Sequence, residues 1–355
     1  MSAVDDAPDL ELDARKRAVL KAIVQGYVRD GEPVGSKRIV AEHDLGVSAA
    51  TVRSDMAALE EAGLIAQPHT SAGRVPTDRG YRFFVDALTE TADLTSEQRS
   101  AVEGLLLGSH DLEDLLRRAS SVLSRVTRFA ALVAAPRFDR SRLRHVELVP
   151  LAPRAVLAVL IADTGSVEKR MLDLAEPIDE HEVQRAGHAV NEAAGGVRLG
   201  DAGDVVHGVV AGAPPELRPL LERIADALDS DLARPSPSEH VFVGGTANLA
   251  GSGHFERLEQ ISSVYAALEE QVLLLQLLQE ALEAGDPAVR IGGELPLGLD
   301  VCSIVVSRYE AGGEAVGSLG VLGPTRMDYP HTLGAVRAVA DSVERALAEL
   351  TGGRG

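Results

Sequence analysis

The sequence predicts an α+β protein made of several domains. Its 355 residues are enough for two or three domains that each bury a core. Apolar residues recur at helical spacing through the first ninety residues, whereas apolar runs of strand length begin at Phe129. Helices gathered at the amino-terminal end, followed by strands mixed with helices, are typical of α+β domains joined in one chain.

The amino-terminal segment predicts three helices in close succession. The first spans Asp13 to Asp30 and stops at Gly31-Glu32-Pro33, because proline has no backbone N–H to continue it. Ser36 is placed to cap a short second helix, Lys37 to His43. After a tight turn at Gly46, Ser48 is placed to cap a third helix, Ala49 to about Ala62. Two short helices joined by a glycine turn form the device that inserts a helix into the major groove.

A short hairpin is predicted after the third helix. Leu64-Ile65-Ala66 starts a strand, residues 69–74 (HTSAGR) make a polar tip, and Val75 begins the return strand. Thr77 is placed to cap a following helix. This order predicts a winged helix-turn-helix over residues 12–90. Such shapes also occur in protein-interaction modules, but a basic wing tip favours binding to double-stranded DNA.

Eleven residues are candidates for DNA contact. In the third helix Val52, Met56 and Leu59 should face the core, which leaves the opposite face for base edges or backbone. The candidates on that face are Ser48, Ala50, Thr51, Arg53 and Ser54. The candidates for phosphates or the minor groove are Lys37, Arg38, His69, Thr70, Ser71 and Arg74.

The charge distribution is compatible with nucleic acid despite a net charge of −19. Residues 12–86 hold 11 lysine and arginine residues and 10 acidic residues, so most of the excess acid lies elsewhere. Residues 1–11 form an acidic arm that we expect to be disordered. One cysteine excludes an internal disulfide, and no signal peptide or membrane-spanning run is visible. We therefore expect a cytoplasmic protein with no membrane partner.

The remaining chain alternates predicted helices and strands. A capping box at Thr95 and Gln98 starts a helix, and Leu112 to Val126 carries a seam that packs within the chain or across a dimer, the first being the default. Strands are expected at 129–135, 143–151, 155–162, 166–174, 205–210, 240–243, 290–291, 302–309 and 315–322. Further helices are expected at 179–194, at 215–232, between 254 and 284, and after 329. Residues 234–238 (RPSPS) read as a linker.

The features that suggest an enzyme have simpler interpretations. Gly244-Gly245-Thr246 lacks the spaced glycines and lysine of a phosphate-binding loop, so we interpret it as a turn. Cys302 lies among valines and isoleucine, which favours a buried, inert thiol. The ten histidines form no HxH or HxxxH pair. Residues 323–328 (GPTRMD) form a polar turn; its side chains are compatible with binding an anion, but we prefer a role in stabilising the fold. We expect no enzyme activity, no cofactor and no bound metal.

Three stretches resemble one known family. Residues 31–86, from GEPVGSKRIV to GYRFFVD, residues 316–347, from VGSLGVLGPTRMDYP to ERAL, and residues 242–250, FVGGTANLA, are similar to the HrcA family, the heat-inducible transcription repressors of bacteria. The resemblance implies a GAF-like domain interrupted by an inserted dimerisation domain. On this plan residues 91–175 and 241–355 form the GAF-like domain, with a helical connector at its start, and residues 176–240 form the insertion.

The resemblance also implies a function. Members of the family bind an inverted-repeat operator of chaperone operons as a homodimer, and the chaperonin modulates their activity. We therefore expect a DNA-binding repressor whose partners are the operator duplex, a second copy of the chain and the chaperonin. An alternative is a winged-helix regulator controlled by a small effector in the GAF-like domain.

Overall fold

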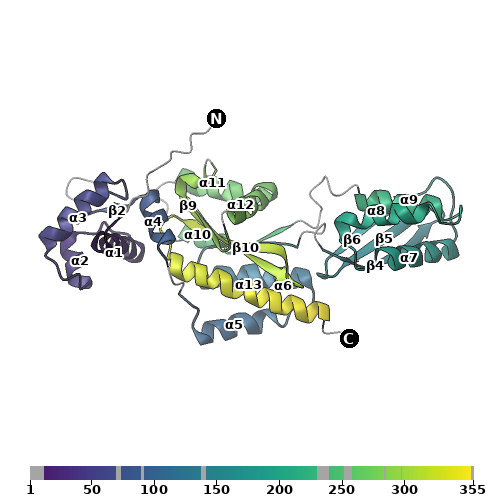
Figure 1. The fold of residues 1–355 in the computed structure, drawn as a ribbon, viewed down its shortest axis with the longest axis horizontal. Helices are drawn as coiled ribbons and strands as arrows, with labels where there is room; N and C mark the ends of the chain where they lie inside the picture. Colours follow the sequence, from purple (N-terminus) through teal and green to yellow (C-terminus); the bar gives the residue numbers. More distant parts are fainter. Residues whose placement is uncertain are drawn as a thin grey trace.

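The chain folds into three units that lie in a row (Figure 1). The computed structural model describes residues 12–68, 73–88, 92–136, 141–229, 240–251, 258–283, 285–296 and 298–352. We name the units by their residues: the N-terminal unit is 12–88, the central unit is 92–136 with 240–352, and the distal unit is 141–229. The acidic arm and the RPSPS segment predicted from the sequence lie outside the described residues.

The N-terminal unit holds four helices and a short hairpin. Its elements are α1 (Ala14–Asp30), α2 (Ser36–Glu42), α3 (Ala49–Glu61), β1 (Ile65–Ala66), β2 (Val75–Pro76) and α4 (Asp78–Asp86). β1 and β2 pair antiparallel. α1 ends where Gly31 adopts a left-handed conformation, with φ at 73°.

One predicted cap in this unit is wrong. α2 begins at Ser36 itself, its N-cap residue is Gly35, and no side chain caps it. The reason is the backbone pairing between Val34 and Arg74, which keeps the chain extended up to Gly35 and starts the helix one residue early.

The central unit is a five-stranded antiparallel sheet covered on both faces. Its strands are β3 (Ala130–Ala134), β7 (Val241–Gly244), β8 (Ala288–Ile291), β9 (Cys302–Ala311) and β10 (Glu314–Pro324), in the order β7-β3-β10-β9-β8. Its helices are α5 (Ser96–Leu106), α6 (Leu112–Thr127), α10 (Ala247–Gly251), α11 (Leu258–Glu269), α12 (Gln271–Glu283), the short 3-10 helix η2 (Gly292–Glu294) and α13 (Tyr329–Gly352).

Alternate residues of β3 show the layering of this unit. Ala131 and Val133 pack on the side of α5, α6 and α13, whereas Ala130, Leu132 and Ala134 pack on the side of α11 and α12. The apolar seam of α6 therefore packs within the chain, and the default prediction is confirmed. β3 precedes the distal unit in the sequence, whereas β7 and β10 follow it. Because β3 pairs with both of them, strands from before and after the distal unit form one sheet.

The distal unit has its own sheet and its own core. The three strands β4 (Leu143–Ala152), β5 (Ala155–Ala162) and β6 (Val167–Asp173) pair antiparallel in that order. The helices α7 (Glu180–Ala194), α8 (Leu199–Val210) and α9 (Arg218–Asp229) cover one face. The hydrophobic cluster of these elements is separate from the clusters of the central unit.

The distal unit corrects two sequence predictions. The predicted boundary between 175 and 176 cuts this unit in two, because β4–β6 pair only with one another and share a core with α7–α9. Residues 141–175 therefore belong to the distal unit. Residues 205–210, predicted as a strand, form the last turns of α8, because Leu199, Ala202 and Val206 are buried at helical spacing.

No single helix among the described residues is long and apolar enough to cross a membrane. Residues 260–269 and 271–280 are long and apolar enough only when taken together, and this pair of helices is bent by 95°.

Candidate nucleic-acid interface

The exposed face of α3 is set by what the helix buries. Val52 and Leu59 are fully buried and Met56 is almost so, as their spacing predicts. The N-terminal half of the opposite face therefore points to solvent, and Ala50, Arg53 and Ser54 are exposed there. The tight turn before α3 places Gly46 in the left-handed region, with φ at 64°.

The N-terminus of α3 is capped as predicted. The Ser48 side chain accepts a hydrogen bond from the backbone N–H of Thr51 at 3.2 Å, and the two hydroxyl oxygens lie 3.1 Å apart. Ser48 is exposed and Thr51 is half-buried. An exposed helix N-terminus carries partial positive charge and free N–H groups, so this end of α3 favours an anion such as a DNA phosphate.

Two of the predicted cationic contacts are available to a ligand. Arg53 on α3 and Lys37 on α2 are exposed, and neither has an ion-pair or hydrogen-bond partner among the described residues. α2 and α3 pack together, so both cations belong to one helical pair.

Two other predicted cations are engaged inside the N-terminal unit. Arg38 pairs with Asp30, and its Nε lies 2.9 Å from Glu42 Oε1. Hydrogen bonds from Arg29 and Arg38 lower the pKa of Glu42. Arg74 donates to Glu60 Oε2 at 3.0 and 2.8 Å. Each would have to leave an ion pair to reach DNA. The Arg38 contacts are exposed, and exposed pairs are weak enough to exchange, whereas the Arg74 contact is partly buried.

The hairpin after α3 supplies the remaining candidates. β1 and β2 are paired through Ile65 with Pro76 and Ala66 with Val75. Its tip, residues 69–72, lies outside the described residues, and with it the predicted contacts His69, Thr70 and Ser71. Arg74 is therefore the one predicted wing residue whose surroundings are described.

An ion pair that sequence reasoning missed fixes α3 against α1. Arg15 donates to the Asp55 carboxylate from Nε at 2.7 Å and from a terminal nitrogen at 3.0 Å. Asp55 is buried, and its hydrogen bonds raise the pKa of Arg15. The sequence carries a signal for this pair: Asp55 falls in the buried phase of α3 between Val52 and Leu59, and a buried carboxylate requires a partner.

Comparison with known proteins identifies the family. A family model described as the HrcA protein C-terminal domain matches residues 113–333. The chain is 48% identical to the heat-inducible transcription repressor HrcA of Streptomyces avermitilis and 47% identical to that of Thermobifida fusca. The first match covers 95% of this chain and 99% of the relative, and the second covers 95% and 97%.

A solved structure shows the same fold. The crystal structure of a hypothetical protein at 2.2 Å resolution matches with a TM-score of 0.62 and 24% sequence identity, covering 96% of this chain and 100% of that one. The family resemblance predicted from the sequence is confirmed by the family model and by relatives matched over almost their whole length. This chain belongs to the HrcA family of heat-inducible transcription repressors.

Proposed function

We propose that this repressor binds an inverted-repeat operator of chaperone operons as a homodimer. On this proposal the N-terminal unit is a winged helix-turn-helix, with α3 as the reading helix and the β1–β2 hairpin as the wing. The central unit is a GAF-like domain, and the distal unit is the inserted dimerisation domain. The observation that carries the proposal is the exposed face of α3, where Arg53 stands beside small side chains that allow close approach to DNA.

Homodimerisation is supported by the open face of the distal sheet. β5 reads AVLAVLIA, which is apolar on both faces, although helices cover only one of them. A strand of an antiparallel sheet with one face in water normally alternates apolar and polar residues. On the uncovered face the neighbouring strands add further apolar side chains, and Val149, Val167 and Met171 are 38%, 50% and 54% exposed.

The cross-strand register gathers these residues into one patch. Val149 pairs with Leu157, which pairs with Met171. In the next row Glu147 pairs with Val159, which pairs with Lys169, so opposite charges flank an apolar centre. A two-fold axis that runs parallel to β5 through that centre brings Glu147 of one copy towards Lys169 of the other. A self-complementary patch of this kind fits a second copy of the same chain.

The dimer interface is tested with one charge placed on the patch. Met171→Glu should shift the protein from dimer to monomer in sedimentation equilibrium, because the new carboxylate would be buried against an apolar surface. Val272→Glu is the matched control, since Val272 is 58% exposed on α12, a helix of the central unit. A Met171→Glu protein that remains a dimer would place the interface elsewhere.

The DNA contact is tested by truncating Arg53. Arg53→Ala should weaken binding to the cognate repeat by about 1–3 kcal/mol while leaving the fold intact, because it removes one guanidinium contact per protomer. Fluorescence anisotropy with the repeat and a scrambled duplex measures the loss. Arg99→Ala on α5 is the control, because that arginine is also exposed. Equal affinity of wild type and Arg53→Ala for the repeat would remove Arg53 from the interface.

The proposal of a chaperonin partner rests on the family resemblance alone. Gel-shift titrations with and without chaperonin test it. Enhanced selective binding would support control by the supply of chaperonin. Selective binding that ignores chaperonin would contradict this part of the proposal and favour a small effector bound by the central unit.

A further inference from the structure

The turn between β10 and α13 contacts the end of α1. This turn carries the TRMDY sequence that the proposed function does not use. The Arg326 guanidinium lies over the Tyr27 ring, 5.9 Å from its centroid. It also fills the space beside Gly31, where an added Cβ would lie 1.7 Å from a terminal nitrogen of Arg326. Arg326 therefore sits at the C-terminal end of α1, where both the aromatic ring and the helix dipole favour a cation.

A second set of contacts holds the N-terminal unit through α4. The rings of Tyr81 and Tyr329 lie 5.8 Å apart. Arg82 pairs with Glu294 and donates to the carbonyl oxygen of Val289 at 2.7 Å. The Asp78 carboxylate, also on α4, accepts a hydrogen bond from the backbone N–H of Gly293 at 3.1 Å. We call these contacts between the N-terminal and central units the joint. The unit is thus held through two of its helices, α1 and α4, which Figure 1 shows beside the central unit, and attachment through two helices restricts its rotation.

The chemistry of this joint depends on direction. Guanidinium–aromatic, aromatic–aromatic and charge-assisted contacts each require a defined geometry, whereas an apolar contact tolerates sliding. Tyr81 is almost fully buried, yet its hydroxyl has no hydrogen-bond partner among the described residues, which costs free energy. One buried apolar cluster also runs from the N-terminal unit into the central unit, so the joint combines apolar packing with contacts that fix an orientation.

We propose that Arg326 is a positioning residue for operator recognition. It holds the N-terminal unit at one angle to the central unit, and so fixes where the two α3 helices of a dimer point. This inference rests on the proposed function, binding of an inverted repeat by a homodimer. A rigid joint makes the dimer accept one separation of half-sites, whereas a loose joint lets each α3 reach its half-site at several separations.

The test compares spacing preference with binding to one half-site. The probes are the inverted repeat that wild-type protein selects from a randomised library, variants whose spacer is lengthened or shortened one base pair at a time, and a single half-site. The proteins are wild type, Arg326→Ala, Arg326→Lys and the control Arg337→Ala, which removes an exposed arginine from α13 of the same unit. Fluorescence anisotropy gives each affinity, and circular dichroism checks the fold.

We expect Arg326→Ala to bind the single half-site as wild type does. It should lose about tenfold or more in affinity for the preferred spacing, with much less discrimination against the other spacings. Arg326→Lys should be intermediate, because a lysine keeps the charge and loses the planar group over Tyr27. Arg337→Ala should match wild type.

Two outcomes separate the failure of this inference from the failure of the proposed function. Wild-type spacing discrimination in Arg326→Ala would overturn the role of Arg326. Wild-type protein that binds neither the half-site nor any repeat would overturn the proposed function itself. A variant that weakens all probes equally would show a structural role only and would also overturn the inference. Should Arg326→Ala fail to fold, Tyr27→Leu removes the other half of the contact, and the same comparison decides.

Discussion

At the scale of single residues, burial sets the chemistry of the one cysteine. Cys302 has no exposed surface, and burial, with a smaller effect of the nearby Asp300 charge, raises its pKa to about 12. The thiolate is the reactive form, so the folded protein should have little of it at neutral pH.

This burial predicts slow thiol chemistry in the native state. At pH 8 the reaction of Cys302 with a disulfide reagent should be at least about a hundredfold slower in native than in denatured protein. The rate of thionitrobenzoate release measures both reactions, and the cysteine-free variant Cys302→Ala gives the background. Comparable rates for the two states would contradict the buried position of this thiol.

Two serines show what a residue pattern can and cannot predict. Both Ser36 and Ser48 precede a helical run, so both are predicted caps. Ser48 caps α3, but Ser36 is the first residue inside α2. The difference comes from Val34, whose backbone pairs with Arg74 forty residues later. Local patterns predict local hydrogen bonds well, but not a backbone shift imposed by a distant strand.

At the scale of elements, α8 shows tertiary packing overriding local preference. Residues 205–210 read VVHGVV, a composition that favours a strand. They continue a helix because Leu199, Ala202 and Val206 face the same core as α9. The capping box of α5 was predictable because both of its hydrogen bonds join Thr95 and Gln98, only three positions apart. The strand prediction failed because the pattern within residues 205–210 does not contain the contact of α8 with α9.

The helical state of α8 can be tested at Gly208. This glycine is exposed inside the helix, and an added Cβ would meet nothing within 4 Å. Gly208→Ala should therefore stabilise α8 by about 0.5–1 kcal/mol, because alanine loses less backbone entropy in a helix. Peptide-level hydrogen exchange measures the local free energy of opening.

The contrasting control for Gly208 lies in α4. An added Cβ on Gly80 would lie 2.0 Å from the Leu64 carbonyl oxygen, so Gly80→Ala should destabilise its helix despite the better propensity. No gain from Gly208→Ala, together with the loss from Gly80→Ala, would argue against a helix at 205–210.

At the scale of the whole molecule, the domain plan was harder to predict than the elements. The strands at 143–174 were predicted, but they were assigned to the same domain as the strand predicted at 129–135. A run of apolar residues indicates that a strand is buried, but it does not indicate which strand pairs with it. β3 pairs with β10, almost two hundred residues away, while β4–β6 pair only with their sequence neighbours. By contrast, the exposed face of α3 was predictable, because it depends on periodicity within one helix.

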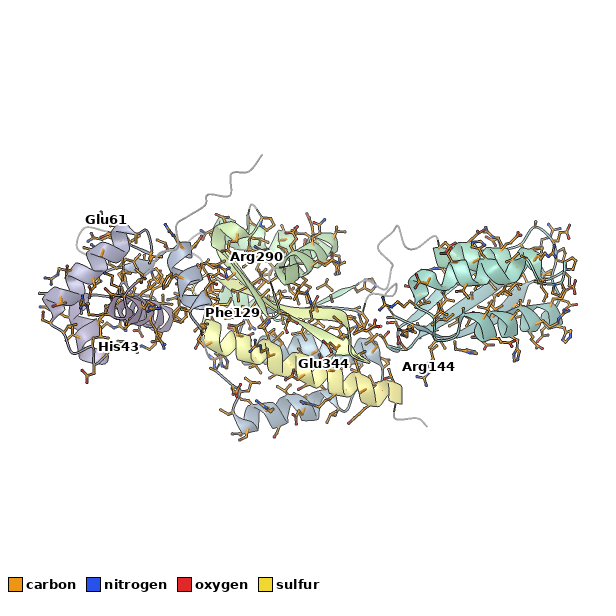
Figure 2. All side chains as sticks on the ribbon, viewed as in Figure 1. His43, Glu61, Phe129, Arg144, Arg290 and Glu344 are labelled. Carbon is orange, nitrogen blue, oxygen red and sulfur yellow. The ribbon has the colours of Figure 1, made fainter. Side chains whose placement is uncertain are left out.

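The distal unit is joined to the central unit by side-chain contacts at the β9–β10 hairpin. Glu314 lies between two arginines of the distal unit, 2.8 Å from Arg198 and 3.5 Å from Arg142. Nearby, Arg144 donates to the carbonyl oxygen of Thr351 at 3.2 Å, and Figure 2 shows it where the distal unit approaches the end of α13. In the dimer that we propose to form through the distal sheet, these contacts would set the orientation of the central unit relative to the dimer axis.

The ion pairs of Glu314 predict that the contact between the distal and central units depends on pH. The hydrogen bond and the charge of Arg198 lower the pKa of Glu314 from its usual 4.5. The carboxylate is therefore charged in the folded protein at pH 4.5 and above, and its ion pairs are lost as pH falls through the lowered pKa.

Spin labels at Arg99→Cys on α5 and His188→Cys on α7 report the distance between the central and distal units. We expect a single narrow distribution at pH 7 and a broader one in acid, with circular dichroism confirming that the protein stays folded. Glu314→Gln should show the broad distribution already at pH 7, whereas the exposed control Glu349→Gln should not. A distribution that is narrow in Glu314→Gln and unchanged in acid would mean that the backbone connections alone orient the distal unit.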